Sequence, residues 1–359
     1  MDNKEYPVIE GLLCPVPLAH HNQIVMGHGS GGRMTQQLFE QVFKPAFDNA
    51  ALREENDFAA TTLPPQARLK GKLSISTDCH IVSPLFFPGG DIGRLAVCGT
   101  VNDMSMSGAE PLYLTAGFIL EEGLKIKILE QVVQSIKTAA VEAGVQIVAG
   151  DTKVVEKGKA DGLFITTTGV GWIPEDRQIG GANAKPGDVV IVSGTLGDHG
   201  IAVLSARGEL GFEAQVVSDT APLNGLIQAV LTAAPHTNVL RDPTRGGLAT
   251  TLNEIARQSH AGILIEERSI PVLPPVRAAC EMLGFDPLYI ANEGKVIVIT
   301  PPEEAEAALG AMRAHPYGTM ATRIGMVIDE PKDRVLLKTL IGGSRILDVL
   351  AGEILPRIC

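Results

Sequence analysis

The chain has 359 residues, 45% of them hydrophobic, which is long enough for two domains with hydrophobic cores of their own. Its 30 basic and 41 acidic residues give a formal net charge of −11, and such a surface repels phosphate backbones, which argues against a nucleic-acid partner. No basic-then-apolar signal pattern opens the chain, and no apolar run approaches the roughly 20 residues that span a bilayer, so we expect no membrane partner. Five scattered cysteines without a C-x-x-C pair argue against a disulfide framework or a zinc knuckle and favour a reduced, cytoplasmic protein.

A glycine-rich stretch follows the first 22 residues, which we expect to form an irregular leader. Residues 27–32 read Gly-His-Gly-Ser-Gly-Gly and contain the G-x-G-x-x-G spacing of dinucleotide-binding loops. A Rossmann fold would need a crossover to a second strand with an acidic residue about 20 positions on, whereas this chain runs into polar residues and Pro64-Pro65. The Rossmann fold is therefore rejected. Two interpretations remain, a flexible loop or a lid whose backbone N–H groups meet phosphate oxygens at Gly29, Gly31 and Gly32.

Short strands alternate with helices through both halves of the chain, which predicts an α/β or α+β architecture. In the first half we expect a helix that follows the glycine-rich stretch and stops at Pro45, strands at 73–77, 111–120, 145–148 and 163–172, a helix capped by Asp91 and a helix over 126–143. In the second half we expect strands at 188–193, 238–240, 263–265 and 295–300, a strand pair within 319–338, and helices near 201–207, 222–233, 247–259, 274–284 and 303–314. The predicted organisation is a leader (1–22), a first domain (23–173), a linker (174–187), a second domain (188–342) and a mobile tail (343–359).

Aspartates recur directly after predicted strands. Asp78, Asp151 and Asp242 occupy such positions, and Asp103 lies beside Asn102 in a predicted helix. Ligands collect at strand ends of α/β sheets, and gathered carboxylates repel one another unless a hard cation such as Mg²⁺ neutralises them. Each aspartate alone is more typical of a turn or a cap. As a set, the four are candidate ligands of a magnesium ion that bridges nucleotide phosphates.

The last four residues, Pro356-Arg357-Ile358-Cys359, place a thiol on a terminus that is stiffened by proline. An ordinary docked tail is the simpler interpretation, and a reactive thiol on an arm is the functional one. His199, between Asp198 and Gly200, is a candidate base or substrate contact, although a loop histidine without such a role is the safer interpretation.

Together the motifs GHGSGG, STD, NDMSMSGA, GDTKVV, SGTLGDHG, DPTRGGL, ANEGK and terminal PRIC resemble the carbamoyl dehydratase family of nickel–iron hydrogenase maturation, the HypE family. The resemblance covers about Gln23 to Cys359 and leaves out the leader with Cys14. The internal motifs alone indicate the larger PurM-like superfamily of aminoimidazole ribonucleotide synthetase, selenophosphate synthetase and thiamine-phosphate kinase. The PRIC terminus is specific to the maturation family.

The resemblance implies a two-domain PurM-like fold in which the first domains of a homodimer pair into a shared β-barrel. It implies ATP and Mg²⁺ in a cleft between the domains, with nucleotide contacts that we expect from the glycine loop and from Asn102, Thr152, Gly246 and Gly247. It further implies that a carbamoyltransferase partner loads Cys359, that the carbamoyl group is dehydrated to a thiocyanate, and that cyanide passes to an iron-bearing scaffold complex.

Two further residues are assigned to the dehydration step, and the resemblance places both beside the thiol. Lys153 is expected to stabilise charge on the activated oxygen and the departing phosphate. Glu293 is expected to accept the nitrogen proton, with His199 as the next candidate. For both, a surface lysine and a turn glutamate without a catalytic role are the alternative.

Three rival functions stay open on sequence alone. Selenophosphate synthetases place a cysteine or selenocysteine in the glycine-rich loop, where this chain has His28 and Ser30. A small-molecule kinase would leave the terminal thiol unexplained. A non-enzymatic metal carrier would use Cys359 and histidines, but apart from His20-His21 the histidines form no cluster.

Overall fold

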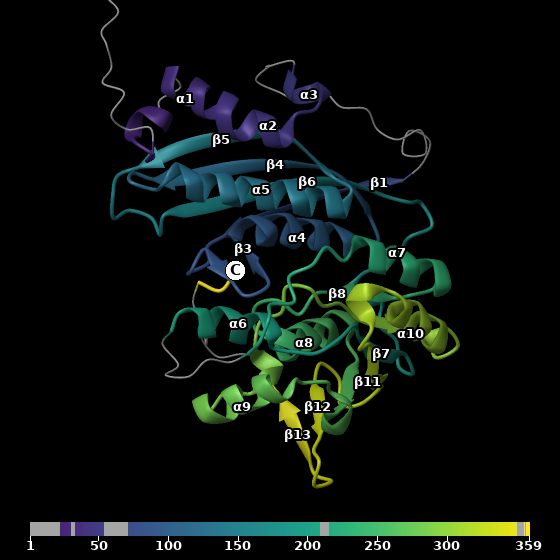
Figure 1. The fold of residues 1–359 in the computed structure, drawn as a ribbon. Helices are drawn as coiled ribbons and strands as arrows, with labels where there is room; N and C mark the ends of the chain where they lie inside the picture. The colour runs from purple at the N-terminus through teal and green to yellow at the C-terminus, as the bar shows by residue number, and fades with distance from the viewer. Residues whose placement is uncertain (1–21, 30–32, 54–70, 209–214, 350–354, 356) are drawn as a thin grey trace, which may run out of the picture.

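The computed structural model describes residues 22–29, 33–53, 71–208, 215–349, 355 and 357–359. Two large β-sheets, one in each half of the chain, are stacked with helices between and around them, and β2 and β3 of the first half form a small two-stranded sheet (Figure 1). The predicted mixed α/β architecture is therefore confirmed. The predicted leader, apart from residue 22, and Gly31 and Gly32 of the glycine-rich stretch lie outside the described residues. None of the described helices is both long and apolar enough to cross a membrane.

The first half forms a four-stranded sheet with the order β1-β6-β4-β5. Strand β6 pairs antiparallel with β1 and with β4, whereas β4 and β5 are parallel and are joined by the crossover helix α5. The elements of this half are η1 (Met26–Gly29), α1 (Arg33–Leu38), η2 (Phe39–Phe43), α2 (Lys44–Phe47), α3 (Ala50–Arg53), β1 (Lys72–His80), β2 (Phe86–Phe87), β3 (Gly90–Asp91), α4 (Ile92–Ser105), β4 (Glu110–Glu121), α5 (Ile126–Ala143), β5 (Gln146–Val155) and β6 (Leu163–Ile173).

Two local predictions in this half can be compared with the structure. Asp91 caps α4 as expected, because its carboxylate accepts the N–H groups of Gly93 and Arg94 at 2.7 and 3.1 Å. The helix expected to stop at Pro45 continues to Phe47, since Pro45 occupies the first turn of α2, where its missing N–H is tolerated.

The second half forms a seven-stranded sheet with the order β13-β12-β9-β11-β7-β10-β8. The interior strands β7 and β10 are buried along their whole length, and all of their residues except Thr300 are apolar. The elements are η4 (Gly181–Asn183), β7 (Val189–Val192), α6 (Asp198–Ala206), α7 (Asn224–Ala233), β8 (Val239–Arg241), α8 (Gly247–Ser259), β9 (Gly262–Glu266), η5 (Glu267–Ser269), α9 (Pro274–Leu283), η6 (Pro287–Tyr289), β10 (Ile297–Thr300), α10 (Ala305–Ala314), η7 (Pro316–Gly318), β11 (Thr322–Ile328), β12 (Val335–Lys338) and β13 (Ser344–Leu347).

Two predictions for the C-terminal region differ from the structure. The strands within 319–338 are β11 and β12, but they do not pair with each other, because β9 lies between them and bonds to both. The segment expected to be a mobile tail from residue 343 begins with β13, which pairs antiparallel with β12. Which strands pair depends on residues far apart in the chain, and the hydrophobic periodicity of a single segment does not predict it.

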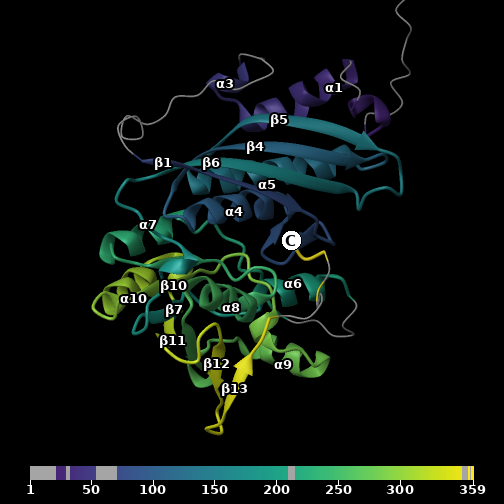
Figure 2. The same cartoon turned by 180° about the vertical axis from the view of Figure 1, so that it is seen from behind.

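One face of the four-stranded sheet is covered by α4 and α5, and the view from behind shows the strands in front of these helices (Figure 2). On β1, the side chains of Leu73 and Ile75 are 56% and 67% exposed, and on β4 Ile119 is 40% exposed. Solvent-exposed apolar side chains in alternation along a strand indicate a face that packs against another surface.

The two halves are joined by buried polar contacts from α4. The Asn102 side chain donates to the carbonyls of Ala221 and Glu293 at 3.0 and 3.3 Å and accepts the N–H of Leu223 at 2.8 Å. Asn224 adds a single, half-buried bond from its Nδ2 to the Ala143 carbonyl at 2.8 Å.

Replacing Asn102 with alanine should leave three buried backbone groups without partners, so we expect a loss of about 2–4 kcal/mol in the free energy of unfolding. Asn224→Ala, which breaks one half-buried bond, is the matched control and should cost about 1 kcal/mol or less. Urea unfolding followed by circular dichroism measures both. Equal unfolding midpoints for the two variants would show that Asn102 does not join the halves.

Candidate active site

The C-terminal residues are held inside the molecule. The N–H groups of Ile81 and Ser83 donate to the carbonyl oxygens of Cys359 and Arg357, both at 3.2 Å. Between them, the side chain of Ile358 is 4% exposed and joins the core of the first half. The terminal thiol thus lies beside the segment that follows β1, close to where the two halves of the chain meet (Figures 1 and 2).

A buried carboxyl group, Glu293, lies next to the terminal thiol. Burial raises the pKa of the Cys359 thiol far above its ordinary value, and the charge of Glu293 and a hydrogen bond with its carboxyl raise that pKa further. Burial also raises the pKa of Glu293 well above its ordinary range, with contributions from Asp219 and Asp78. Its Oε1 atom finds no hydrogen-bond partner among the described residues. A raised pKa makes the ionised carboxylate a strong proton acceptor, and Oε1 is a spare acceptor atom, so Glu293 can act as a general base once it is ionised.

Three of the four predicted metal-binding aspartates come together near this pair. Burial raises the pKa of Asp103 to about 7, and the charges of Asp242 and Asp78 contribute to the increase. Burial likewise raises the pKa of Asp242, with Asp78 adding to it. Carboxylates that disfavour one another's ionisation are stabilised by a cation.

A closed metal cage is not formed by these aspartates. No three Asp, Glu, His or Cys side chains in the described ranges are close enough to hold a metal ion between them. The set nevertheless fits Mg²⁺, which usually keeps several waters and takes one or two carboxylates together with substrate phosphates.

A pocket of about 570 Å³ opens beside two of these aspartates, Asp103 and Asp242. Its volume is within the range of small-molecule sites. Arg245 also lines it, and the positive charge of Arg245 acts to lower the pKa of the Cys359 thiol. Arg245 therefore lines the pocket and lies within electrostatic range of the thiol. Sequence reasoning quoted its motif, DPTRGGL, but did not select the arginine.

Gly246 and Gly247 allow the chain to turn into α8 at the edge of this pocket. Their φ angles of +78° and +60° are in the left-handed region that favours glycine. A Cβ on Gly247 would lie 2.6 Å from the Leu288 carbonyl oxygen, so the loop could not pack against the segment that leads to Glu293. Their predicted contact with a nucleotide stays a prediction.

The side chains of two predicted site residues, Asn102 and His199, form hydrogen bonds with other groups of the protein. Asn102, expected to contact the nucleotide, uses its carboxamide to bind three backbone groups, one of them the carbonyl of Glu293. His199, a candidate base, is fully buried, and burial lowers its pKa, so the ring is neutral. Its Nε2–H donates to the Ile358 carbonyl at 2.7 Å and its Nδ1 accepts from the Ser218 hydroxyl at 2.8 Å. In this structure His199 holds the tail and has no nitrogen left for proton transfer.

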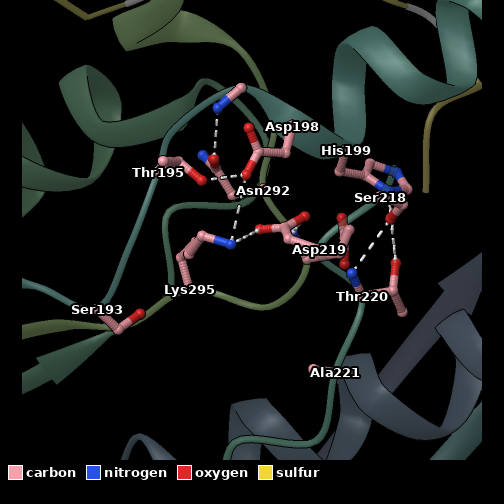
Figure 3. A network of polar contacts seen from close by, with 12 residues as sticks. Ser193, Thr195, Asp198, His199, Ser218, Asp219, Thr220, Ala221, Asn292 and Lys295 are labelled. Carbon is pink, nitrogen blue, oxygen red and sulfur yellow. Dashed lines mark hydrogen bonds and ion pairs between the residues drawn. The ribbon is translucent and has the colours of Figure 1, made fainter. Parts of the chain in front are cut away.

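Sequence reasoning missed a buried ionic network that supports Glu293 (Figure 3). Lys295 Nζ lies 3.0 Å from Asp219 Oδ2 and 3.7 Å from Asp198 Oδ2. Burial acts to raise the pKa of Asp219, but Lys295 and other partners outweigh it and hold that pKa below its ordinary value. The Asp219 carboxylate accepts the backbone N–H of Glu293 at 3.1 Å. The motif ANEGK contains Lys295, but no local signal links it to Asp219, 76 positions earlier in the chain.

The fourth aspartate, Asp151, lies apart from the other three within one chain. Asp78 is paired with Thr167, Thr167 with Ala116 and Ala116 with Gly150, so β1 and β5 are the two edges of the sheet. Three strand spacings put Asp78 and Asp151 roughly 14 Å apart. Within one chain Asp151 is therefore separated from Asp78, and its predicted role as a metal ligand stays a prediction.

A second group of predicted residues gathers along β5. Lys153 Nζ lies 2.9 Å from Asp151 Oδ2, and the two side chains are 64% and 72% exposed. Gly29 packs against the same strand, and a Cβ at this position would lie 2.5 Å from the Val154 nitrogen. Thr152 lies between Asp151 and Lys153. The predicted site residues thus form two groups, one along β5 and the other where β1 and α4 meet the second half of the chain.

Comparisons with known proteins agree with this architecture. Residues 56–173 match the AIR synthase related protein N-terminal domain, and residues 185–338 match the AIR synthase related protein C-terminal domain. The carbamoyl dehydratase HypE of Cupriavidus necator is 56% identical over 337 residues, which cover 94% of this chain and 95% of that protein.

Two solved structures are similar over most of their length. A crystal structure of the hydrogenase maturation protein HypE in complex with ATP has a TM-score of 0.88 and 51% identity, covering 93% of this chain and 99% of the other. A chain of a HypE–HypF complex has a TM-score of 0.76 and 50% identity, covering 89% of this chain and all (100%) of the other. With the motifs, the two matching domains and this degree of identity in agreement, the chain belongs to the HypE family of carbamoyl dehydratases, enzymes of hydrogenase maturation with a PurM-like fold.

Proposed function

We propose that the protein uses ATP to dehydrate a carbamoyl group carried on its own Cys359, giving a thiocyanate that supplies the cyanide ligands of the nickel–iron hydrogenase centre. One observation carries this proposal: the terminal thiol is held against the buried carboxyl of Glu293, next to an acidic pocket of nucleotide size. The names of the relatives, and the ATP complex of one of them, support the same reaction.

The chemistry explains why both ATP and a base are needed. An amide oxygen is a poor leaving group, so the carbamoyl oxygen first takes the γ-phosphoryl group of ATP, releasing ADP and one nitrogen proton. The remaining nitrogen proton then passes to Glu293 as the C–O bond breaks, which leaves a C≡N bond on the sulfur and frees phosphate. Burial keeps the pKa of Glu293 high, which makes its carboxylate a stronger proton acceptor.

The three gathered aspartates are assigned to the binding of Mg²⁺ at the phosphates of ATP. Asp78, Asp103 and Asp242 would hold Mg²⁺, which would neutralise charge on the phosphates during transfer. Arg245 lines this pocket and acts electrostatically on the thiol, and its guanidinium would orient the transferring group.

The residues on β5 are assigned to the site of a second copy. The uncovered face of the first sheet exposes Leu73, Ile75 and Ile119, which suits the predicted homodimer with a shared β-barrel. In the strand register Asp151 and Lys153 point to this same face, away from α4. We therefore assign Asp151, Thr152 and Lys153 of one chain to the phosphates bound by its partner.

The proposed partners follow from the reaction. A carbamoyltransferase must load the thiol, and the solved complex of a relative with HypF supports such a partner. An iron-bearing scaffold complex that accepts cyanide is the proposed recipient.

Mass spectrometry of the intact chain tests the carrier role of Cys359. After incubation with the carbamoyltransferase, its carbamoyl donor and ATP, the wild-type protein should gain a carbamoyl group and then lose one water. Cys359→Ser should gain no adduct while binding ATP normally, because the thiol is the acceptor. A carbamoyl adduct that forms on Cys359→Ser and loses water at the normal rate would rule the proposal out.

Replacing Glu293 with glutamine tests the base. The variant should load the carbamoyl group and bind ATP, but it should lose water on the order of a hundredfold more slowly, as expected for a missing general base. Rapid-quench sampling of the C-terminal peptide mass gives this rate directly. Dehydration at the wild-type rate would place the base elsewhere.

A mixed dimer tests the assignment of Lys153 to the partner's site. Lys153→Ala and Glu293→Gln chains with different affinity tags are co-expressed, and the heterodimer is purified through both tags. One site of this heterodimer contains both substitutions and the other contains neither, so about half of the wild-type activity should return. If both residues served the same chain, each site would carry one lesion, and the heterodimer would be as inactive as the two parent homodimers.

A further inference from the structure

Helix α6 contacts the docked tail at both of its ends. His199, in its first turn, donates to the carbonyl of Ile358 at 2.7 Å. Arg207, the C-cap residue, donates from Nη2 to the carbonyl of Arg357, also at 2.7 Å. Two successive carbonyls of the tail are thus bound by side chains from one helix, and neither side chain has a role in the chemistry derived above.

Arg207 also binds the segment on which the tail lies. Its Nε donates to the carbonyl of Ser83 at 2.7 Å, while the N–H of Ser83 donates to the carbonyl of Arg357. The planar guanidinium therefore ties together the tail and the segment on which the tail lies. A lysine could not reproduce this arrangement, because its single ammonium group lacks the fixed fork of donors.

Other groups also hold the docked tail. Arg357 forms an ion pair with Asp161 at 2.8 Å across a largely exposed surface, and such pairs contribute little. Ile358 supplies a buried side chain, Leu355 and Cys359 pack against the core, and the Cys359 thiol hydrogen-bonds the Glu293 carboxyl. The segment after β1 adds two backbone hydrogen bonds. Because the two bonds of Arg207 are charge-assisted and link the tail to the segment beneath it, their loss shifts the docking equilibrium.

The docked position suits one half of the reaction and not the other. Burial raises the pKa of the Cys359 thiol, so the docked sulfur is protonated and a poor nucleophile. Loading with a carbamoyl group requires the free thiolate, whereas dehydration requires the loaded sulfur beside Glu293. Any group that stabilises docking favours dehydration and opposes loading.

We propose that Arg207 is a positioning residue that holds the C-terminal tail in its docked state and so sets the balance between loading and dehydration. The docking role rests on the contacts alone, and its effect on the two half-reactions rests on the proposed function. Arg207 acts through the tail and touches no reacting atom.

Alkylation of Cys359 by iodoacetamide, read from the mass of the C-terminal peptide in the full-length protein, tests the docking role independently of catalysis. Arg207→Ala should raise the alkylation rate by about tenfold or more, the effect of losing a charged hydrogen-bond donor. Arg207→Lys should fall between this variant and wild type. The control is Arg345→Ala, which removes the surface ion pair between Arg345 of β13 and Asp286 and should leave the rate unchanged.

The second measurement follows both half-reactions with the carbamoyltransferase and ATP. Arg207→Ala should load at least as fast as wild type and dehydrate several-fold more slowly, whereas general structural damage would slow both. Wild-type alkylation of a folded Arg207→Ala protein, or equal slowing of both half-reactions, overturns the proposal. Faster alkylation without any ATP-dependent loss of water in the wild-type enzyme would keep the docking role and reject the proposed function.

Discussion

The site depends on one buried carboxyl group, Glu293, which forms no ion pair with any residue that the structure describes. Its backbone is held on both sides, by Asp219 at the N–H and by Asn102 at the carbonyl, while Oε1 of its side chain has no hydrogen-bond partner in the described part of the chain. A buried carboxyl in this state is costly to the fold, and such costs are retained at functional sites. The neighbouring ion pair of Lys295 and Asp219 places a fixed negative charge beside it, which keeps its affinity for a proton high.

Both halves of the chain contribute residues to the site around Glu293. Glu293 and Asp242 come from the second half, Asp78 and Asp103 come from the first, and Asn102 and Arg94 connect the halves by hydrogen bonds to backbone carbonyls, at Glu293 and Thr220 among others. Packing between the halves removes water from the carboxyl and from the thiol together. A closed, dry site of this kind strengthens every charge interaction within it and protects a reactive intermediate from hydrolysis.

The tail brings the substrate carrier into this closed site with contacts from three parts of the fold. The segment after β1 provides backbone donors, α6 provides His199 and Arg207, and the core of the first half receives Ile358. A covalently carried substrate has a high effective concentration, so weak docking is sufficient for reaction. Weak docking also leaves the terminus free to reach another protein.

Local sequence signals determined the parts of this protein that depend on neighbouring residues. Hydrophobic periodicity located most strands and helices, the Asp91 cap was readable from its position before α4, and the motifs with the terminal thiol indicated the family. Cys359 was selected from its place at the terminus and Glu293 with the help of that resemblance, and the structure brings them into contact.

Only the tertiary structure decided which polar residues meet. Asp151 looked equivalent to Asp78 in sequence, but strand order placed the two at opposite edges of a sheet, and no single-strand pattern contains that order. Asn102 and His199 looked like ligand contacts, but backbone groups more than a hundred residues away occupy their side chains, and Lys295 pairs with Asp219 over a comparable separation. A carboxylate or an imidazole carries the same chemistry wherever it stands in the chain, and the long-range packing that surrounds it decides whether it binds a substrate, a proton or its own backbone.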